Sequence, residues 1–190
     1  MKPQDIEKRS FEIITAELGE RTFPAGIAEV VKRVIHTTAD FDYADSLAFS
    51  PDVIEKAKAA LAAGATVVTD TNMALSGVSK ATLAKLGGKA VCLMADEQVA
   101  REAKARGVTR AVVSMEHAAR LDGPLIFAVG NAPTALIRLH ELIGKDEVKP
   151  ALVIGVPVGF VNVVEAKELF IGGKTPYIIA RGRKGGSNVA

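Results

Sequence analysis

A histidine near the end of a predicted helix is the residue best placed for chemistry in this sequence. Apolar residues between Ile27 and Ile35 recur at helical spacing, which predicts an amphipathic helix with one apolar stripe. At about 100° per residue, His36 lies on roughly the opposite side of that helix. The carbonyl end of a helix favours a charged imidazole, so His36 could donate a proton. A surface histidine without a function would fit the same pattern.

Three predicted strand ends are rich in glycine, asparagine or proline, which lets backbone N–H groups approach an anion. They comprise residues 129–133 (Val-Gly-Asn-Ala-Pro), 155–159 (Gly-Val-Pro-Val-Gly) and 180–187 (Ala-Arg-Gly-Arg-Lys-Gly-Gly-Ser). None has the spacing of the dinucleotide fingerprint or of a P-loop, so a nucleotide site is only weakly indicated. Tight turns between a strand and a helix are the alternative interpretation.

A small basic cluster near the C-terminus comprises Arg181, Arg183 and Lys184, and guanidinium groups bind carboxylates well. A solvated tail is the alternative. No set of His, Cys, Asp and Glu has the spacing of metal ligands, and no G-x-S-x-G motif indicates a serine hydrolase. These residues together favour an enzyme that acts on a small acidic molecule, but they do not identify that molecule.

The elements that must position these residues follow from an alternation of short apolar runs with helical patterns. This alternation predicts an α/β fold, a three-layer sandwich with a mostly parallel central sheet of Rossmann-like type. Strands are expected at 65–69, 90–94, 125–129, 151–155 and 177–180. Helices are expected at 6–18, from 27, at 50–64, from 79, at 96–107 and after the last two inner strands. Residues 40–49 are interpreted as a loop or a short edge strand, and 109–121 as a helix in preference to a strand.

Two helix caps and one strand end make more specific predictions. Ser50 is the expected N-cap of a helix with Pro51 in its first turn, and Asn131 is the expected cap of the helix after strand 125–129. Strand 65–69 ends in the polar run Asp70–Met73. Ligands of open α/β sheets gather outside such strand ends, so this run is a candidate by position only.

Length and composition limit the class of protein. A chain of 190 residues with 48% hydrophobic residues is expected to form one domain, residues 1–190. A net charge of +2 gives no support to a general nucleic-acid binder. The single cysteine, Cys92, lies in an apolar run and is expected to be a buried structural thiol. No signal peptide or membrane-length apolar run is present, so we expect a cytoplasmic protein with no membrane partner.

Seven segments, taken in order, resemble the precorrin-8 methylmutase family, also called precorrin isomerases, which has a cobalt-precorrin branch. The segments are 7–14 (Glu-Lys-Arg-Ser-Phe-Glu-Ile-Ile), 33–38 (Arg-Val-Ile-His-Thr-Thr), 49–51, 70–73 with Gly77-Val78, 130–136, 155–161 and 181–187. Each segment is weak evidence alone, whereas the ordered set is specific and spans nearly the whole chain.

The resemblance implies an isomerase of cobalamin biosynthesis. Such enzymes move a methyl group between adjacent ring-C carbons of precorrin-8 or cobalt-precorrin-8, which gives hydrogenobyrinate or cobyrinate without an organic cofactor. By the same resemblance, His36 protonates or hydrogen-bonds the macrocycle during the shift. The implied substrate-binding residues are Ser10, Arg33, Arg110, Asn131 and Arg181, with no metal ligand. A homodimer with its site near the subunit interface is also implied.

The chain departs from the family's pattern at two places. Residues 162–164 are Asn-Val-Val where the family usually has Gly-Ala-Ala, and Ala39 stands where a glycine is common. Bulkier side chains at 162–164 would change the shape of the pocket. A tetrapyrrole-binding or chaperone protein without catalytic activity is therefore a second hypothesis, and a Rossmann-like nucleotide binder, favoured by fold analogy alone, is a third.

Overall fold

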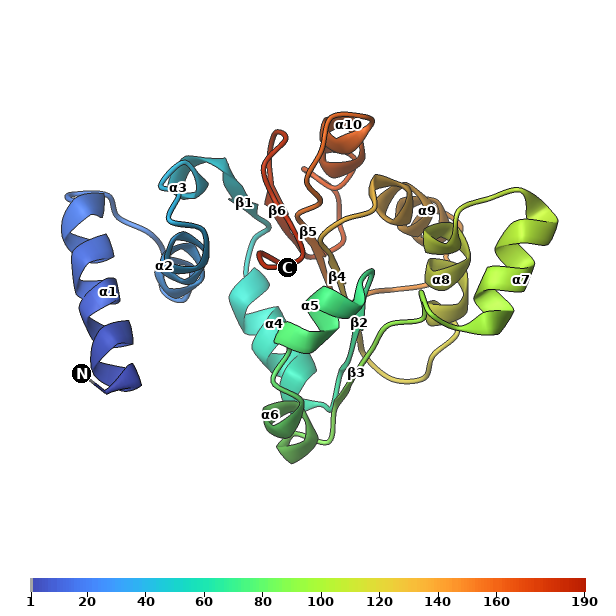
Figure 1. The fold of residues 1–190 in the computed structure, drawn as a ribbon, viewed down its shortest axis with the longest axis horizontal. Coiled ribbons are helices and arrows are strands. Elements are labelled where there is room, and N and C mark those ends of the chain that lie inside the picture. The colour runs from blue at the N-terminus through green and yellow to red at the C-terminus, as the bar shows by residue number, and fades with distance from the viewer. Residues whose placement is uncertain (1) are drawn as a thin grey trace. The chain divides into compact units, whose positions relative to one another are not determined.

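The computed structural model describes residues 2–190, which form two compact units (Figure 1). The helical unit comprises the residues up to Leu47, with Val189, and the sheet unit comprises Ala48–Asn188, with Ala190.

The helical unit contains α1 (Pro3–Leu18), α2 (Ile27–Thr38) and the short α3 (Tyr43–Ser46). The first two confirm the predicted helices, and α1 ends at Gly19 as expected. Val31, Val34 and Ile35 form the buried stripe of α2, and these residues are each less than a tenth exposed. The apolar spacing therefore reports correctly which side of α2 packs inward.

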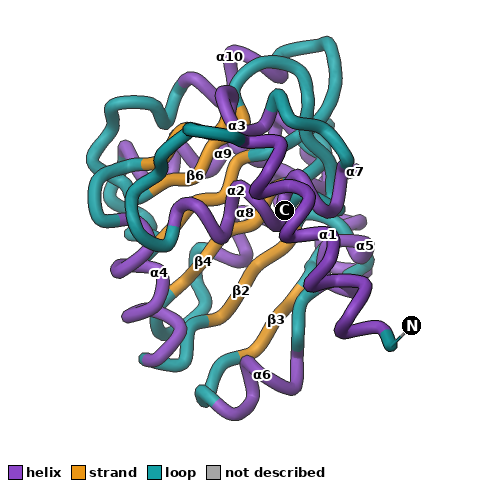
Figure 2. Tube along the Cα trace, turned by 90° about the vertical axis from the view of Figure 1, so that its left-hand side faces the viewer, coloured by secondary structure: helices purple, strands orange, loops and turns teal. Residues whose placement is uncertain are grey.

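The sheet unit is built on a six-stranded sheet in the order β1-β6-β5-β4-β2-β3. Figure 2 shows the inner strands side by side, with helices around them. The strands are β1 (Leu47–Phe49), β2 (Thr66–Thr69), β3 (Lys89–Val91), β4 (Leu125–Val129), β5 (Leu152–Gly155) and β6 (Tyr177–Ala180). The helices are α4 (Val53–Ala62), α5 (Asn72–Gly77), α6 (Lys80–Lys85), α7 (Glu97–Arg106), α8 (Arg110–Ala118), α9 (Pro133–Gly144) and α10 (Val163–Glu168).

Strands β2 to β6 pair in parallel throughout. All five residues of β4 are buried. Since successive side chains of a strand point to opposite faces, both faces of the sheet must be covered at β4. Helices α4 and α9 both contact this strand. The predicted α/β fold with a mostly parallel sheet is confirmed, as is the helix predicted at 109–121.

The two predicted caps are wrong. Helix α4 begins at Val53 after Asp52, and the Ser50 hydroxyl instead accepts a hydrogen bond from the Tyr177 backbone nitrogen at 2.9 Å. Helix α9 begins at Pro133 after Ala132, so Asn131 lies outside it. In addition, Cys92, which follows the edge strand β3, is only partly buried and not the fully buried thiol expected from the sequence.

The order of the strands creates a switch point between β2 and β4. The chain leaves β2 toward β3 on one side of the sheet and leaves β4 toward β5 on the other. In open α/β sheets, the crevice outside the carboxyl ends of two such strands is the usual place for a ligand. No helix among residues 2–190 is both long enough and apolar enough to cross a bilayer.

Candidate active site

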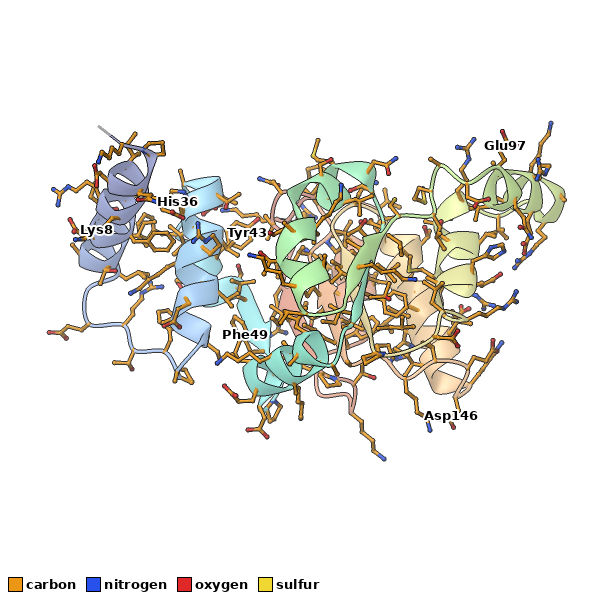
Figure 3. All side chains as sticks on the ribbon, turned by 90° about the horizontal axis from the view of Figure 1, so that it is seen from below. Lys8, His36, Tyr43, Phe49, Glu97 and Asp146 are labelled. Atoms are coloured by element: carbon orange, nitrogen blue, oxygen red, sulfur yellow. The ribbon has the colours of Figure 1, made fainter. Side chains whose placement is uncertain are left out.

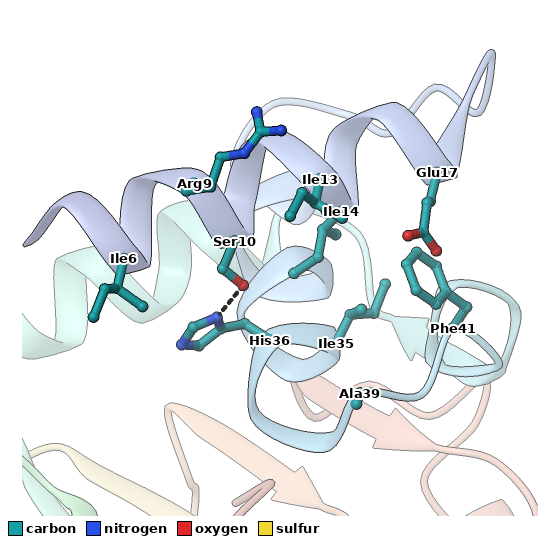
Figure 4. Close-up of a pocket in the computed structure, with 10 residues that line it drawn as sticks. All are labelled: Ile6, Arg9, Ser10, Ile13, Ile14, Glu17, Ile35, His36, Ala39 and Phe41. Atoms are coloured by element: carbon teal, nitrogen blue, oxygen red, sulfur yellow. Dashed lines mark hydrogen bonds between the residues drawn. The ribbon is translucent and has the colours of Figure 1, made fainter. Parts of the chain in front are cut away.

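His36 lies in the last turn of α2 and is held by a serine of α1. The Ser10 hydroxyl and Nδ1 of His36 are 2.7 Å apart (Figure 4). This bond engages Nδ1, so Nε2 is the ring nitrogen that remains to exchange a proton with a ligand. Two residues predicted from sequence are therefore brought into direct contact across 26 positions of the chain.

An aromatic ring of α1 supports the imidazole from a second direction. Phe11 stacks on His36 with 5.3 Å between ring centroids and 15° between their planes. The Arg33 guanidinium lies 4.7 Å from the centre of the same phenyl ring and also pairs with Glu7. Hydrogen bonding from Arg33 holds the pKa of Glu7 below its usual range. Arg33 and His36 therefore both contact the ring of Phe11. Figure 3 shows His36 between α1 and α2.

A pocket of about 360 Å³ opens beside this histidine. Its wall is mostly apolar and carries four polar side chains, those of Arg9, Ser10, Glu17 and His36. The apolar part comprises Ile6, Ile13, Ile14, Ile35, Ala39 and Phe41. An apolar wall with a few convergent polar groups is the usual composition of a small-molecule site.

In the sheet unit, Asp70 occupies the switch point. Its carboxylate is 1% exposed and accepts hydrogen bonds at 2.7–2.8 Å from the backbone N–H groups of Gly130, Asn131 and Ala132. These are the groups that would bind a phosphate in a nucleotide-binding α/β protein. An internal carboxylate already satisfies them, which argues against the nucleotide-binding hypothesis.

The C-terminal glycine-rich segment fills the same crevice. A Cβ on Gly130 would lie 2.7 Å from Cα of Ser187, so only glycine permits this close approach. The Ser187 hydroxyl is 2.8 Å from that of Thr71, and Gly186 donates its backbone N–H to Val156 at 2.8 Å. The three glycine-rich strand ends singled out in the sequence therefore converge on one edge of the sheet.

The other predicted binding residues also belong to the sheet unit. Arg110 is exposed at the start of α8, where the hydroxyl of the preceding Thr109 lies 3.2 Å from that of Thr134. Asn131 is exposed beside Asp70. Arg181 forms a two-pronged ion pair with Glu168 at 2.9 Å for each bond. The predicted set thus divides into Ser10, Arg33 and His36 in one unit and the remaining three in the other.

The two departures from the family's pattern have a backbone explanation. Ala39 ends α2 with φ of +54°, and Asn162 precedes α10 with φ of +57°. Both angles lie in the left-handed region, which glycine adopts freely and asparagine adopts more easily than other residues. The asparagine at 162 therefore satisfies the backbone requirement that explains a glycine there, and its effect on pocket shape stays a prediction.

Three important residues were missed as functional or structural centres: Phe11, Asp70 and Lys167. For Lys167 a signal existed, because Val163, Ala166, Lys167 and Phe170 follow the helical spacing of a buried stripe. Asp70 was noted only by its position after a strand. Among residues 2–190, no group of three or more His, Cys, Asp or Glu side chains is arranged to hold a metal ion.

Comparison with known proteins agrees with this geometry. The profile of the precorrin-8X methylmutase (CbiC) family matches residues 5–190. The chain is 45% identical to the cobalt-precorrin-8 methylmutase of Priestia megaterium, covering 100% of this chain and 84% of that protein. It is 39% identical to the precorrin-8X methylmutase of Pseudomonas aeruginosa, covering 98% and 90% respectively.

A solved structure extends the comparison to the fold. The precorrin-8x methyl mutase of Thermus thermophilus superposes with a TM-score of 0.88 at 41% identity, covering 98% of this chain and 90% of that one. The family expected from the ordered motifs is confirmed: this chain belongs to the precorrin-8X methylmutase family.

Proposed function

We propose that this protein is an isomerase of cobalamin biosynthesis that moves a methyl group between adjacent ring-C carbons of precorrin-8 or cobalt-precorrin-8. The observation that carries the proposal is the Ser10–His36 pair in an apolar pocket, in a chain of this family. Curated relatives carry the names of both the metal-free and the cobalt substrate, so either one is a candidate here.

In the proposed mechanism, His36 exchanges a proton with the macrocycle through Nε2 while Ser10 fixes Nδ1. The methyl shift redistributes charge over the conjugated ring, and a positioned acid stabilises that charge as it develops. Phe11 restricts the tilt of the imidazole by stacking. The pocket of about 360 Å³ is at the small end of ligand sites, so it takes one ring of the tetrapyrrole with its substituents.

The acetate and propionate arms of the substrate require cationic and N–H donors. We assign this role to Arg33, Arg110, Asn131 and Arg181. Arg110 is exposed, and among the described residues no carboxylate pairs with it. Planar guanidinium groups bind carboxylates through two parallel hydrogen bonds, which suits them to such arms. We further propose that the chain is a single domain that works as a cytoplasmic homodimer.

The test is an anaerobic incubation of the purified protein with each substrate, followed by visible absorption. We expect a shift to the corrin-type spectrum with one of them, which also identifies the branch of the pathway. His36→Ala should fold normally and lose about 10²–10⁴-fold in kcat, since a positioned acid contributes that much. His140→Gln, at a histidine that packs on Phe170 in the other unit, is the matched control.

Unchanged turnover in His36→Ala would overturn the mechanism. Binding of the pigment without any spectral conversion by the wild-type protein would favour the tetrapyrrole carrier instead.

A further inference from the structure

Lys167 is a fully buried lysine at the end of α10, with a relative exposure of 0%. Among the described residues it has no carboxylate partner. Its ammonium donates hydrogen bonds to two backbone carbonyls, those of Gly182 at 2.9 Å and Lys184 at 2.8 Å. Burial alone lowers the pKa of Lys167 to about 8. A buried ammonium without a counter-charge is costly even when it is hydrogen-bonded, so Lys167 indicates a requirement that an apolar side chain would not meet.

What Lys167 holds is the backbone of the basic segment 181–184. This segment turns sharply, since Gly182 has φ of +76°. Its carbonyls point inward to the ammonium, and the Arg181 and Arg183 side chains are exposed. Arg183 lies 5.3 Å from the ring centre of Phe160, a side chain that is 82% exposed.

The neighbouring residue Glu168 holds the same segment by a side chain. It binds Arg181 through two hydrogen bonds of 2.9 Å, and the Arg181 side chain is 55% exposed. An ion pair this open to solvent contributes little to stability and can be exchanged for another carboxylate. Residues 167 and 168 therefore hold the segment in two ways, by two buried hydrogen bonds to its backbone and by a solvent-exposed ion pair to its Arg181 side chain.

We propose that Lys167 is a positioning residue: it keeps the 181–184 backbone in place so that Arg181 can exchange Glu168 for a carboxylate arm of the substrate without reordering the segment. This inference rests on the proposed role of Arg181 and adds the device that prepares it for binding. Preorganisation of this kind raises affinity because the entropy of ordering is not lost on binding.

The experiment is a double-mutant cycle on KM, kcat and the tetrapyrrole Kd from absorption titration. The variants are Lys167→Met, Arg181→Gln and the double substitution, with Lys149→Met at an exposed lysine as the matched control. We expect each single variant to raise KM and Kd about tenfold, the scale of one charge-assisted contact, with kcat within about twofold. The double variant should be no worse than Arg181→Gln, because Lys167 acts through Arg181.

Hydrogen exchange gives a second measurement, in which amides of residues 181–187 should lose protection in Lys167→Met. If Lys167→Met does not fold, the same measurements are made on Lys167→Arg, which keeps the charge but places its donors differently. We expect that variant also to raise KM and Kd. Normal KM in the folded Lys167 variants beside a raised KM in Arg181→Gln would overturn the positioning role and leave the carboxylate role intact. Additive effects would also overturn it. A normal KM in Arg181→Gln would remove the proposed role of Arg181 and this inference together.

Discussion

At the scale of single residues, Ala39 is in a backbone conformation that disfavours its own side chain. A Cβ costs roughly 1 kcal/mol at such a left-handed position, and glycine avoids that cost. We expect Ala39→Gly to raise the free energy of unfolding by about 0.5–1 kcal/mol in urea denaturation. Ala59→Gly, in the regular interior of α4, is the control and should lower it by about 1 kcal/mol. A loss of stability in Ala39→Gly would contradict the strain assigned to this position.

The carboxylate of Asp70 accepts hydrogen bonds from three backbone N–H groups at once. In Asp70→Asn a single neutral carbonyl oxygen must replace two charged ones, and the new NH₂ group faces other donors. We expect a loss of about 1–3 kcal/mol in the free energy of unfolding, as for a buried donor left unsatisfied. The exposed Asp122→Asn should change stability by less than about 0.5 kcal/mol. Equal stability of the two variants would show that the strand-end loop does not depend on Asp70.

At the scale of elements, a charge network joins α7, α8 and α9. The buried Glu116 on α8 accepts hydrogen bonds from Arg106 of α7 and lies 2.8 Å from Nε of Arg138 of α9. Hydrogen bonding from Arg106, followed by the charges of both arginines, holds the pKa of Glu116 below its usual value. A lowered folded-state pKa adds stability above the unfolded pKa, and this stability is lost as pH falls through the folded value.

We therefore expect Glu116→Gln to lose about 2–3 kcal/mol at pH 7. The difference from wild type should begin to shrink below about pH 4.3, the ordinary glutamate pKa, because the unfolded wild-type chain then binds a proton that the folded protein does not. It should vanish once the pH has fallen through the lowered folded-state pKa. Urea denaturation of both proteins across pH 3–8 measures it. A constant difference over that range would mean that the ionised form of Glu116 is not what matters.

Elements with a strong hydrophobic period could be predicted from sequence, and those set by distant contacts could not. The apolar stripe of α2 correctly predicted a helix, and the apolar run of β4 correctly predicted a strand. In both segments the burial of apolar side chains determines the secondary structure. Ser50 has every local feature of an N-cap, yet its hydroxyl bonds to Tyr177, 127 positions away. The local preference is worth about 1 kcal/mol, and a tertiary contact of similar strength overrides it.

At the scale of the whole molecule, the family could be recognised from ordered motifs, whereas the arrangement of the motifs needed three dimensions. Sequence reasoning chose Ser10 and His36 separately, and the structure adds their hydrogen bond and the Phe11 ring. The sequence alone could not show that Asp70 and Lys167 each hold a strand-end segment. Both side chains bind backbone groups, and every residue has those groups whatever its type.

The filled switch point has a consequence for how the protein responds to the state of the cell. With Asp70 and the 185–187 segment in the crevice, the usual place for adenine dinucleotides and nucleoside triphosphates is taken by the chain itself. We expect millimolar NAD(H) or ATP to leave Tm unchanged. A ligand that bound the folded protein at about 100 times its Kd would raise the free energy of unfolding by about 2.7 kcal/mol, and Tm with it. Flux through this step would then follow the supply of its pigment and would not respond to the concentrations of these nucleotides.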